Sequence, residues 1–463
     1  MTAEVLPRLA VGERVAGLEI SGAWLVDPTS GREGPADIVV SDGAVEAVAW
    51  LDGADADGIG PDGIVVAPGL TDLHAHFREP GNEDAETVAS GCAAAAHGGF
   101  TTVCLMPNTD PPLDEPGVLG RVLAAASASG SPVRVLAYGC VSARRAGEQL
   151  AALGELADAG VAGFSDDGSP TRSAAVFRSA LAYAASLGLP IVEHAEDLPM
   201  TEGAEASDGL VATILGLRGS PASAEAVAVA RALAILAEVA VDEPAARLHL
   251  THLSTRAALD LVRRARAAGL PVTCDVTPHH LALTDEWIAG SRRWAWDGAE
   301  DRSAAPYDPS LRVNPPLRSR DDAAACLEAL LDGTVDAIAT DHAPHTAVDK
   351  HVEFGLAANG ISGIETTLGL VLAAVDAGRL PLLRAIKALT VGPAGVLGAH
   401  AGRRPGLVVG EPADLVVFDR SDRWTVTPAT LLSRGKNSPL LGLEVPGRVL
   451  LTVVGGRLAY VAE

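Results

Sequence analysis

A single unit repeats along most of this chain and limits the folds that the chain can adopt. The unit consists of a short apolar run typical of a β-strand, an Ala- and Leu-rich stretch typical of a helix, and a Gly or Pro before the next run. The apolar runs span residues 65–76, 101–107, 133–141, 161–165, 190–194, 247–252, 271–276 and 335–340. Such alternation indicates parallel strands with crossover helices, and eight units predict an α/β fold, a closed (β/α)8 TIM-type barrel.

The two ends of the chain depart from this repeat. Residues 1–66 and 396–463 contain alternating apolar segments between Ser, Gly and Asp turns, without a convincing long helix. This pattern is typical of short β-strands. We therefore expect both ends to form one small β-sandwich domain beside a barrel of residues 67–395.

One internal stretch also departs from the strand–helix repeat. Residues 289–310 have no apolar period but contain Trp294, Trp296 and Tyr307 among several charged residues. A loop of this length is uncommon unless it is functional or disordered. The stretch is interpreted either as a lid over a site or as a variable surface loop.

Charge and composition exclude several classes of protein. The 463 residues are 48% hydrophobic and 20% charged, with a formal net charge of -24, so binding to nucleic acid or to an anionic membrane surface is not expected. The apolar runs are interrupted before the roughly 20 residues that a membrane span needs, and the first residues lack a secretory signal. Five scattered cysteines without a Cys-x-x-Cys pair are expected to be reduced and packed in the core. These features predict a cytoplasmic protein.

Residue types that bind metals follow the predicted strands at their carboxyl ends. The first run ends with His74 and His76, and a spacing of two places both side chains on one side of a strand. Further candidates stand at the ends of the fourth, fifth, sixth and eighth runs: Asp166 and Asp167, His194, His252, and Asp341. Four imidazoles and two or three carboxylates exceed what one tetrahedral ion needs, so the pattern predicts two divalent metal ions that share a bridging carboxylate.

The scarcity of lysine limits the identity of the bridging group. Lys350, Lys387 and Lys436 are the only lysines, and all of them follow the last predicted strand. Binuclear barrels of this general kind often bridge their metals with a carbamylated lysine on strand four, which this chain lacks. A carboxylate must take that place, and Asp166 and Asp167 are the two candidates.

Seven short motifs stand out along the chain, most of them at or just beyond the ends of predicted strands. They are PGLTDLHAHFREPG (68–81), MPNT (106–109), DDG (166–168), EHAED (193–197), TPHH (277–280), NPPLR (314–318) and DHAPH (341–345). Together they resemble class I dihydroorotases of the amidohydrolase superfamily. The resemblance implies two zinc ions held by His74, His76, Asp167, His194, His252 and Asp341, with Asp167 as the bridge. It also implies substrate contacts from His76, Arg78, Asn108, Asn314, His345, Phe354 and Gly355.

The activity that this resemblance implies is the reversible cyclisation of N-carbamoyl-L-aspartate to L-dihydroorotate in de novo pyrimidine biosynthesis. Asp341 would be the catalytic acid and base. Arg78 suits the substrate because a guanidinium can bind a carboxylate through two parallel hydrogen bonds. The resemblance further suggests homo-oligomers and a complex with aspartate carbamoyltransferase as assemblies.

Two alternatives stay open at this point. A hydantoinase, dihydropyrimidinase or allantoinase would use a similar site on a different ring, although the resemblance implies a lysine bridge for those relatives. A non-catalytic paralogue that serves as a structural subunit is the second alternative. Such proteins typically lose metal ligands, whereas all six are present here.

Overall fold

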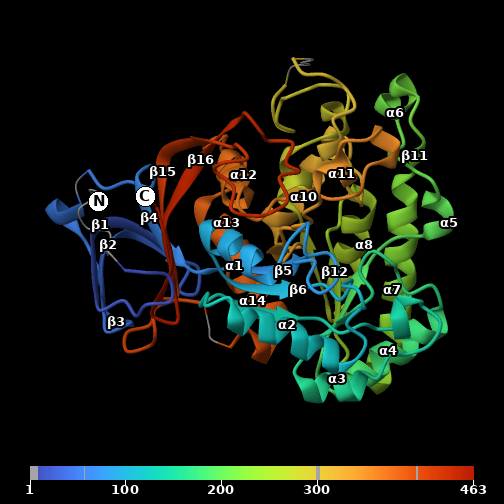
Figure 1. The fold of residues 1–463 in the computed structure, drawn as a ribbon, viewed down its shortest axis with the longest axis horizontal. Coiled ribbons are helices and arrows are strands. Elements are labelled where there is room, and N and C mark those ends of the chain that lie inside the picture. The colour runs from blue at the N-terminus through green and yellow to red at the C-terminus, as the bar shows by residue number, and fades with distance from the viewer. Residues whose placement is uncertain (1–8, 57, 299–302, 403–404, 463) are drawn as a thin grey trace.

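The computed structural model describes residues 9–462 except 57, 299–302 and 403–404. Figure 1 shows two parts, a sheet that combines strands from both termini and a larger part in which helices surround the remaining strands. The α/β class and the parallel strands that the repeat predicts are confirmed.

Both ends of the chain contribute to one seven-stranded sheet, in the order β17-β16-β15-β4-β1-β2-β3. Its strands are β1 (Gly17–Asp27), β2 (Arg32–Ser41), β3 (Ala44–Trp50), β4 (Ile64–Pro68), β15 (Leu415–Thr425), β16 (Glu444–Val454) and β17 (Arg457–Val461). Strand β4 joins the two ends, because it pairs with β1 on one side and with β15 on the other. Alternate residues of β2 are buried, so one face of this sheet covers an apolar core of its own.

Eight further strands form two parallel sheets in the larger part. One contains β5 (Leu70–Ala75), β6 (Phe100–Leu105) and β7 (Arg134–Ala137), and the other contains β8 (Phe164–Ser165), β9 (Ile191–His194), β12 (Leu248–Thr251), β13 (Val272–Val276) and β14 (Ala337–Ile338). Two isolated parallel bridges connect the edges of these sheets. Gly139 pairs with Phe164, and Ala75 pairs with His342.

The helices follow the strands in sequence and cover them on the outside (Figure 1). The longer ones are α1 (Val88–His97), α2 (Pro116–Ala128), α3 (Leu153–Ala159), α4 (Ala174–Ser186), α7 (Ala222–Asp242), α8 (Arg256–Ala267), α10 (Arg320–Asp332), α12 (Thr367–Asp376), α13 (Leu382–Leu389) and α14 (Val391–Leu397). Shorter elements lie in the connections: α5 (Leu198–Thr201), β10 (Ala206–Ser207), α6 (Leu210–Leu215), β11 (Gly219–Ser220), α9 (Pro278–Ala282) and α11 (Ala347–Lys350). Ser or Thr side chains cap several helices, as Thr87 caps α1 and Ser319 caps α10.

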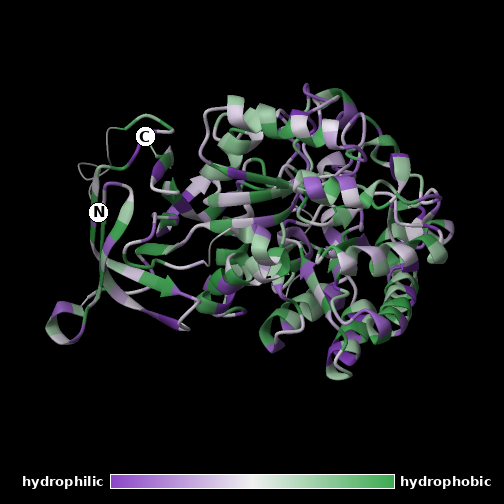
Figure 2. Ribbon diagram, turned by 90° about the horizontal axis from the view of Figure 1, so that it is seen from below, coloured by the Kyte–Doolittle hydropathy of each residue, from purple (hydrophilic) through white to green (hydrophobic). Residues whose placement is uncertain are grey.

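Figure 2 shows hydrophobic residues along the inner strands and more hydrophilic residues on the outer helices. All five cysteines are free and buried, as the sequence predicts. Among the described residues, one segment, Leu382–Ala401, has the length and apolar composition of a membrane span. It is divided between α13, α14 and a short 3-10 turn, and it is mostly buried against the rest of the fold, so it is a core segment and no membrane protein is indicated.

The first predicted strand, residues 65–76, is not one strand. The chain divides at Gly69 into β4, which belongs to the terminal sheet, and β5, which belongs to the parallel strands. A Cβ atom at Gly69 would lie 2.1 Å from the Cγ2 atom of Thr101, so the close approach of β6 requires glycine there. The apolar pattern hid this division because both strands are almost entirely buried.

Candidate metal centre

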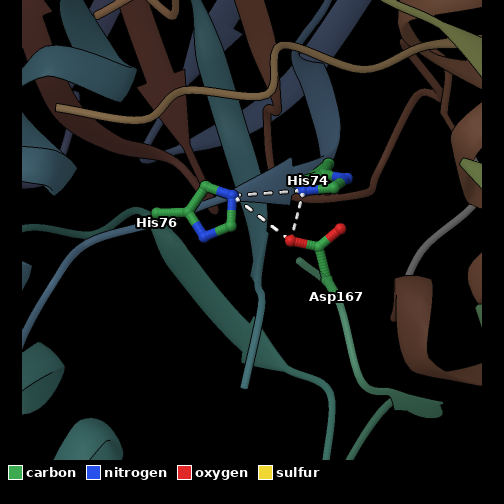
Figure 3. A group of neighbouring side chains, drawn as sticks. All are labelled: His74, His76 and Asp167. Atoms are coloured by element: carbon green, nitrogen blue, oxygen red, sulfur yellow. Dashed lines mark hydrogen bonds and ion pairs between the residues drawn. The ribbon is translucent and has the colours of Figure 1, made fainter. Parts of the chain in front are cut away.

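The structure brings the six sequence-predicted metal ligands together at one end of the parallel strands. His74 and His194 belong to β5 and β9, whereas Asp167, His252 and Asp341 follow β8, β12 and β14. Figure 3 shows the side chains of His74, His76 and Asp167 pointing toward one another. All six are at least 94% buried.

The first group of donor atoms surrounds one oxygen of Asp167. The Nε2 atoms of His74 and His76 lie 3.2 Å apart, and they lie 3.4 and 3.7 Å from Oδ2 of Asp167. Oδ1 of Asp341 completes the group at 3.2 Å from Nε2 of His76 and 3.5 Å from Nε2 of His74. Ligand atoms at roughly 2.0–2.2 Å from one tetrahedral ion lie about 3.3–3.6 Å apart, so this group fits a single divalent ion.

The second group surrounds the other oxygen of the same carboxylate. Nδ1 of His194 lies 3.0 Å from Nε2 of His252, and Oδ1 of Asp167 lies 3.5 Å from the former and 3.3 Å from the latter. Asp167 therefore presents one oxygen to each group. This is the geometry of a carboxylate that bridges two cations.

The two aspartates of residues 166–168 have different partners. Oδ1 of Asp166 accepts hydrogen bonds from the backbone N–H groups of Val141 and Ser142, so its side chain anchors the loop that follows β7. Asp167 instead contacts the histidines described above. Of the two candidates, Asp167 is thus the one whose carboxylate lies between the two donor groups.

Burial and charge have opposite effects on the pKa values of these residues. Burial alone lowers the pKa of His74 and of His194, but the adjacent Asp167 carboxylate outweighs it and raises them to about 9 and about 10. Burial likewise raises the pKa of Asp167, yet the histidines hold it well below its ordinary value. The carboxylates thus require positive charge between them, which divalent ions would supply in place of protons.

A buried network orients the histidine rings. Nδ1 of His74 lies 2.8 Å from Oγ1 of Thr251, which donates to Asp275 at 3.1 Å. Asp275 also accepts from the backbone N–H of His252 and lies 2.8 Å from Nε2 of His249. The far nitrogen of His74 is therefore held by a side chain, as is usual for histidines that bind metals.

Neither the residues of this network nor Glu196 was predicted from the sequence. Thr251 and Asp275 lie inside predicted strands, where they resemble ordinary strand residues. Glu196 was visible two residues after His194, in a motif used only for the family resemblance. For Thr251 and Glu196 the available signal was their position beside His252 and His194, and no such signal marked Asp275.

Several predicted substrate contacts border the centre. Oδ1 of Asn108 lies 2.8 Å from Nδ1 of His76. Arg78 donates from Nε to the carbonyl of Pro344 at 3.0 Å, and its Nη2 lies 3.2 Å from Nε2 of His345. Arg78 adopts a positive φ of 57°, an unusual conformation that is common at functional sites.

The other predicted substrate contacts are Asn314, Phe354 and Gly355. Nδ2 of Asn314 lies 3.4 Å from Nε2 of His194, and Asn314 lines a cavity of about 110 Å³. Phe354 packs in an apolar cluster with residues such as Leu311. Gly355 abuts Glu205, which lines the same cavity, and a Cβ atom there would lie 2.0 Å from Oε1 of Glu205.

Known proteins similar to this chain identify its family. The model of the amidohydrolase family matches residues 65–459. A protein named dihydroorotase from Anaeromyxobacter dehalogenans (strain 2CP-1 / ATCC BAA-258) is 46% identical over 96% of this chain and 98% of its own length. A dihydroorotase from Geobacter sp. (strain M21) is 41% identical over 96% of this chain and 99% of its own length.

Among solved structures, an L-hydantoinase (dihydropyrimidinase) from Arthrobacter aurescens is similar in fold, with a TM-score of 0.77 and 26% identity over 96% of each chain. The parallel strands and the histidine–aspartate cluster thus define a member of the amidohydrolase family, to which the chain belongs. Within that family, its full-length relatives at 40–46% identity are the dihydroorotases.

Proposed function

We propose that this centre catalyses the reversible cyclisation of N-carbamoyl-L-aspartate to L-dihydroorotate, the dihydroorotase reaction of pyrimidine biosynthesis. The observation that carries the proposal is the carboxylate of Asp167, which gives one oxygen to each of two donor groups beside the guanidinium of Arg78. The names of the full-length relatives support the same activity. The chain is thus a cyclic amide hydrolase of the dihydroorotase type.

We infer the finer architecture from the strand pairing. The bridges from Gly139 to Phe164 and from Ala75 to His342 support a (β/α)8 barrel over residues 67–395, because they connect both edges of the two parallel sheets. The joint terminal sheet supports a small β domain built from residues 1–66 and 396–463, and its description as a β-sandwich stays a prediction. Ligands at the carboxyl ends of barrel strands are typical of such enzymes.

The residues present fit two divalent ions, and zinc suits their imidazole and carboxylate donors. His74, His76 and Asp341 would hold one ion, His194 and His252 the other, and Asp167 both. Bound divalent ions polarise a carbonyl group and lower the pKa of water from about 15.7 toward 7.

We infer that Asp341 moves the proton. Burial raises its pKa, but the hydrogen bond and charge of His76, with His74, lower it below its ordinary value, so Asp341 is a carboxylate at neutral pH. In the hydrolytic direction it accepts a proton from the attacking water and returns it to the ring nitrogen as the C–N bond breaks. In the cyclising direction the same residue takes the proton from the attacking ureido nitrogen and returns it to the departing oxygen of the carboxyl group, which has taken up a proton from solution, so that water leaves as the C–N bond forms.

Arg78 binds the substrate carboxylate that does not react. Its guanidinium is largely buried and lies near Asp341 and Asp167 without an ion-pair partner of its own among the described residues. A buried cation of this kind favours an anionic substrate. It also supplies local positive charge in a protein with a net charge of -24.

A direct assay separates the candidates. The purified protein with zinc should hydrolyse L-dihydroorotate and leave hydantoin and allantoin unchanged. Preferential turnover of hydantoin would favour a cyclic amidase of the kind named for the Arthrobacter structure. Absence of turnover with all three substrates, in protein that carries two zinc ions, would indicate the non-catalytic paralogue.

Assembly and location belong to the same proposal. We infer a cytoplasmic enzyme that forms homo-oligomers and binds aspartate carbamoyltransferase, as the family resemblance suggests. Light scattering of the protein alone and mixed with aspartate carbamoyltransferase tests both assemblies. An unchanged monomer mass in both samples contradicts them. The lid interpretation of residues 289–310 also stays a prediction, and its residues 299–302 lie outside the described part of the chain. Within the described part, Trp294 and Trp296 pack against apolar core residues.

A further inference from the structure

The two ring nitrogens of His194 face different partners. Nδ1 points to the second donor group, at 3.0 Å from Nε2 of His252. Nε2 lies on the other side of the ring, 2.9 Å from Oε2 of Glu196. An ionised carboxylate only accepts hydrogen bonds, so Nε2 must carry the proton in the neutral ring. The lone pair is then on Nδ1, on the side where a metal ion would be bound.

Glu196 is held firmly in this position. Its Oε1 accepts a hydrogen bond from Oγ1 of Thr201 at 2.5 Å, and its side chain is only 12% exposed. Its two carboxylate oxygens therefore have separate partners, Oε1 facing Thr201 and Oε2 facing His194.

The same oxygen also orients a predicted substrate contact. Oε2 of Glu196 accepts from Nδ2 of Asn314 at 3.0 Å. Since a carboxylate cannot donate, this bond fixes which end of the Asn314 amide faces Glu196. The amide oxygen is left as a hydrogen-bond acceptor, which suits a ligand that offers an N–H group at this position. Both Glu196 and Asn314 line the cavity of about 110 Å³ described above.

We propose that Glu196 is a positioning residue that couples metal binding to substrate recognition. Through His194 it selects the tautomer and ring orientation that bind the second ion. Through Asn314 it makes the site selective for ligands that carry an N–H beside the reacting amide, as dihydroorotate and carbamoyl aspartate do. The inference rests on the proposed function, because it assumes the two-ion centre and this substrate class.

The test is metal affinity of the Glu196→Gln variant, measured by competition with a chromogenic zinc chelator. Gln keeps the size of the side chain but lacks the charge, and its amide oxygen cannot hold both His194 and Asn314 as strongly. We expect one of the two zinc ions to bind about 10- to 100-fold more weakly, and the other to bind as in the wild type. The KM for dihydroorotate should rise in zinc-saturated enzyme.

Glu205→Gln is the matched control. Glu205 lines the same cavity, and its carboxylate accepts from the backbone N–H of Arg218 rather than from a metal ligand. This variant removes the same charge and is expected to bind both zinc ions with wild-type affinity. Equal weakening in both variants would show a general effect of charge and would overturn the proposal.

A milder variant protects the test against loss of folding. Thr201→Val removes one hydrogen bond from Glu196 without touching His194 or Asn314. It should weaken the binding of the same zinc ion, by a smaller factor than Glu196→Gln does. Wild-type zinc affinities in both Glu196→Gln and Thr201→Val refute the role of Glu196 and leave the proposed function intact. Failure of the wild-type protein to bind two zinc ions would instead refute the proposed function.

Discussion

At the scale of single residues, the two aspartates of the centre, Asp167 and Asp341, differ in the histidines that they contact. Asp167 contacts both donor groups, whereas Asp341 contacts only the group of His74 and His76. Loss of Asp167 would therefore affect both ions, and loss of Asp341 leaves three donors for the first ion. Because a variant of Asp341 can still bind both ions, proton transfer can be tested at this residue separately from metal binding.

Asp341→Asn should retain zinc and lose turnover by several orders of magnitude. The amide keeps the shape of the side chain but cannot accept and return a proton. Zinc content by atomic emission and kcat for dihydroorotate check both parts. Wild-type activity in this variant contradicts the assignment of Asp341 as acid and base.

Arg78→Lys should impair substrate binding more than catalysis. A lysine keeps one positive charge but cannot form two parallel hydrogen bonds with a carboxylate. Loss of one charged hydrogen bond costs about 1.5–3 kcal/mol, which would lower kcat/KM by roughly 10- to 100-fold. We expect this effect mainly as a higher KM, since Arg78 is proposed to bind the carboxylate that does not react. An unchanged KM for dihydroorotate would place the substrate carboxylate elsewhere.

At the scale of elements, strand ends were predictable and connections between distant segments were not. Alternating strand and helix patterns report local burial, and they located His74, His194 and His252 correctly at strand ends. The division at Gly69 depends on the approach of Thr101 from another strand, which no local pattern records. Nor does a local pattern record the hydrogen bond between Glu196 and Asn314, which lie 118 residues apart in the chain.

Asn437 is a second long-range connection of this kind. It follows β15 in the sequence, yet its side chain accepts from the backbone N–H of His345 at 2.8 Å and donates to the carbonyls of Ala343 and Gly360. The segment around Asn437 therefore holds the loop that follows β14, where Asp341 and His345 lie. The C-terminal part of the chain thereby contributes to the shape of the site.

Asn437→Ala should destabilise the fold and raise KM together. Asn437 is 5% exposed, so its loss leaves buried partners unsatisfied at about 1–3 kcal/mol for each group. Urea denaturation should show the loss of stability, and kinetics with dihydroorotate should show the weaker binding. The exposed Asn82 provides the control, because Asn82→Ala should change neither quantity. A destabilised Asn437→Ala with unchanged KM would limit Asn437 to a structural role.

At the scale of the whole molecule, the centre connects segments that are distant in the sequence. The six predicted ligands extend from residue 74 to residue 341 and come from the ends of β5, β8, β9, β12 and β14. In the absence of cations, buried carboxylates and imidazoles must compensate one another through protons. Ion binding therefore favours the folded chain over the unfolded one, in which these donors are far apart.

Removal of zinc should therefore lower the thermal stability of the entire larger part of the molecule. A ligand present at 100 times its dissociation constant stabilises the folded state by about 2.7 kcal/mol, so the melting temperature should rise as zinc is added back to chelated protein. Calorimetry of the apo and reloaded protein measures this. His194→Ala should reduce the response, because it removes a ligand of one ion. His400→Ala, outside the centre, should respond as the wild type does. A melting temperature that is independent of zinc in the wild type would mean that the six side chains do not hold the ions in the folded state, and that their mutual compensation by protons is sufficient for stability.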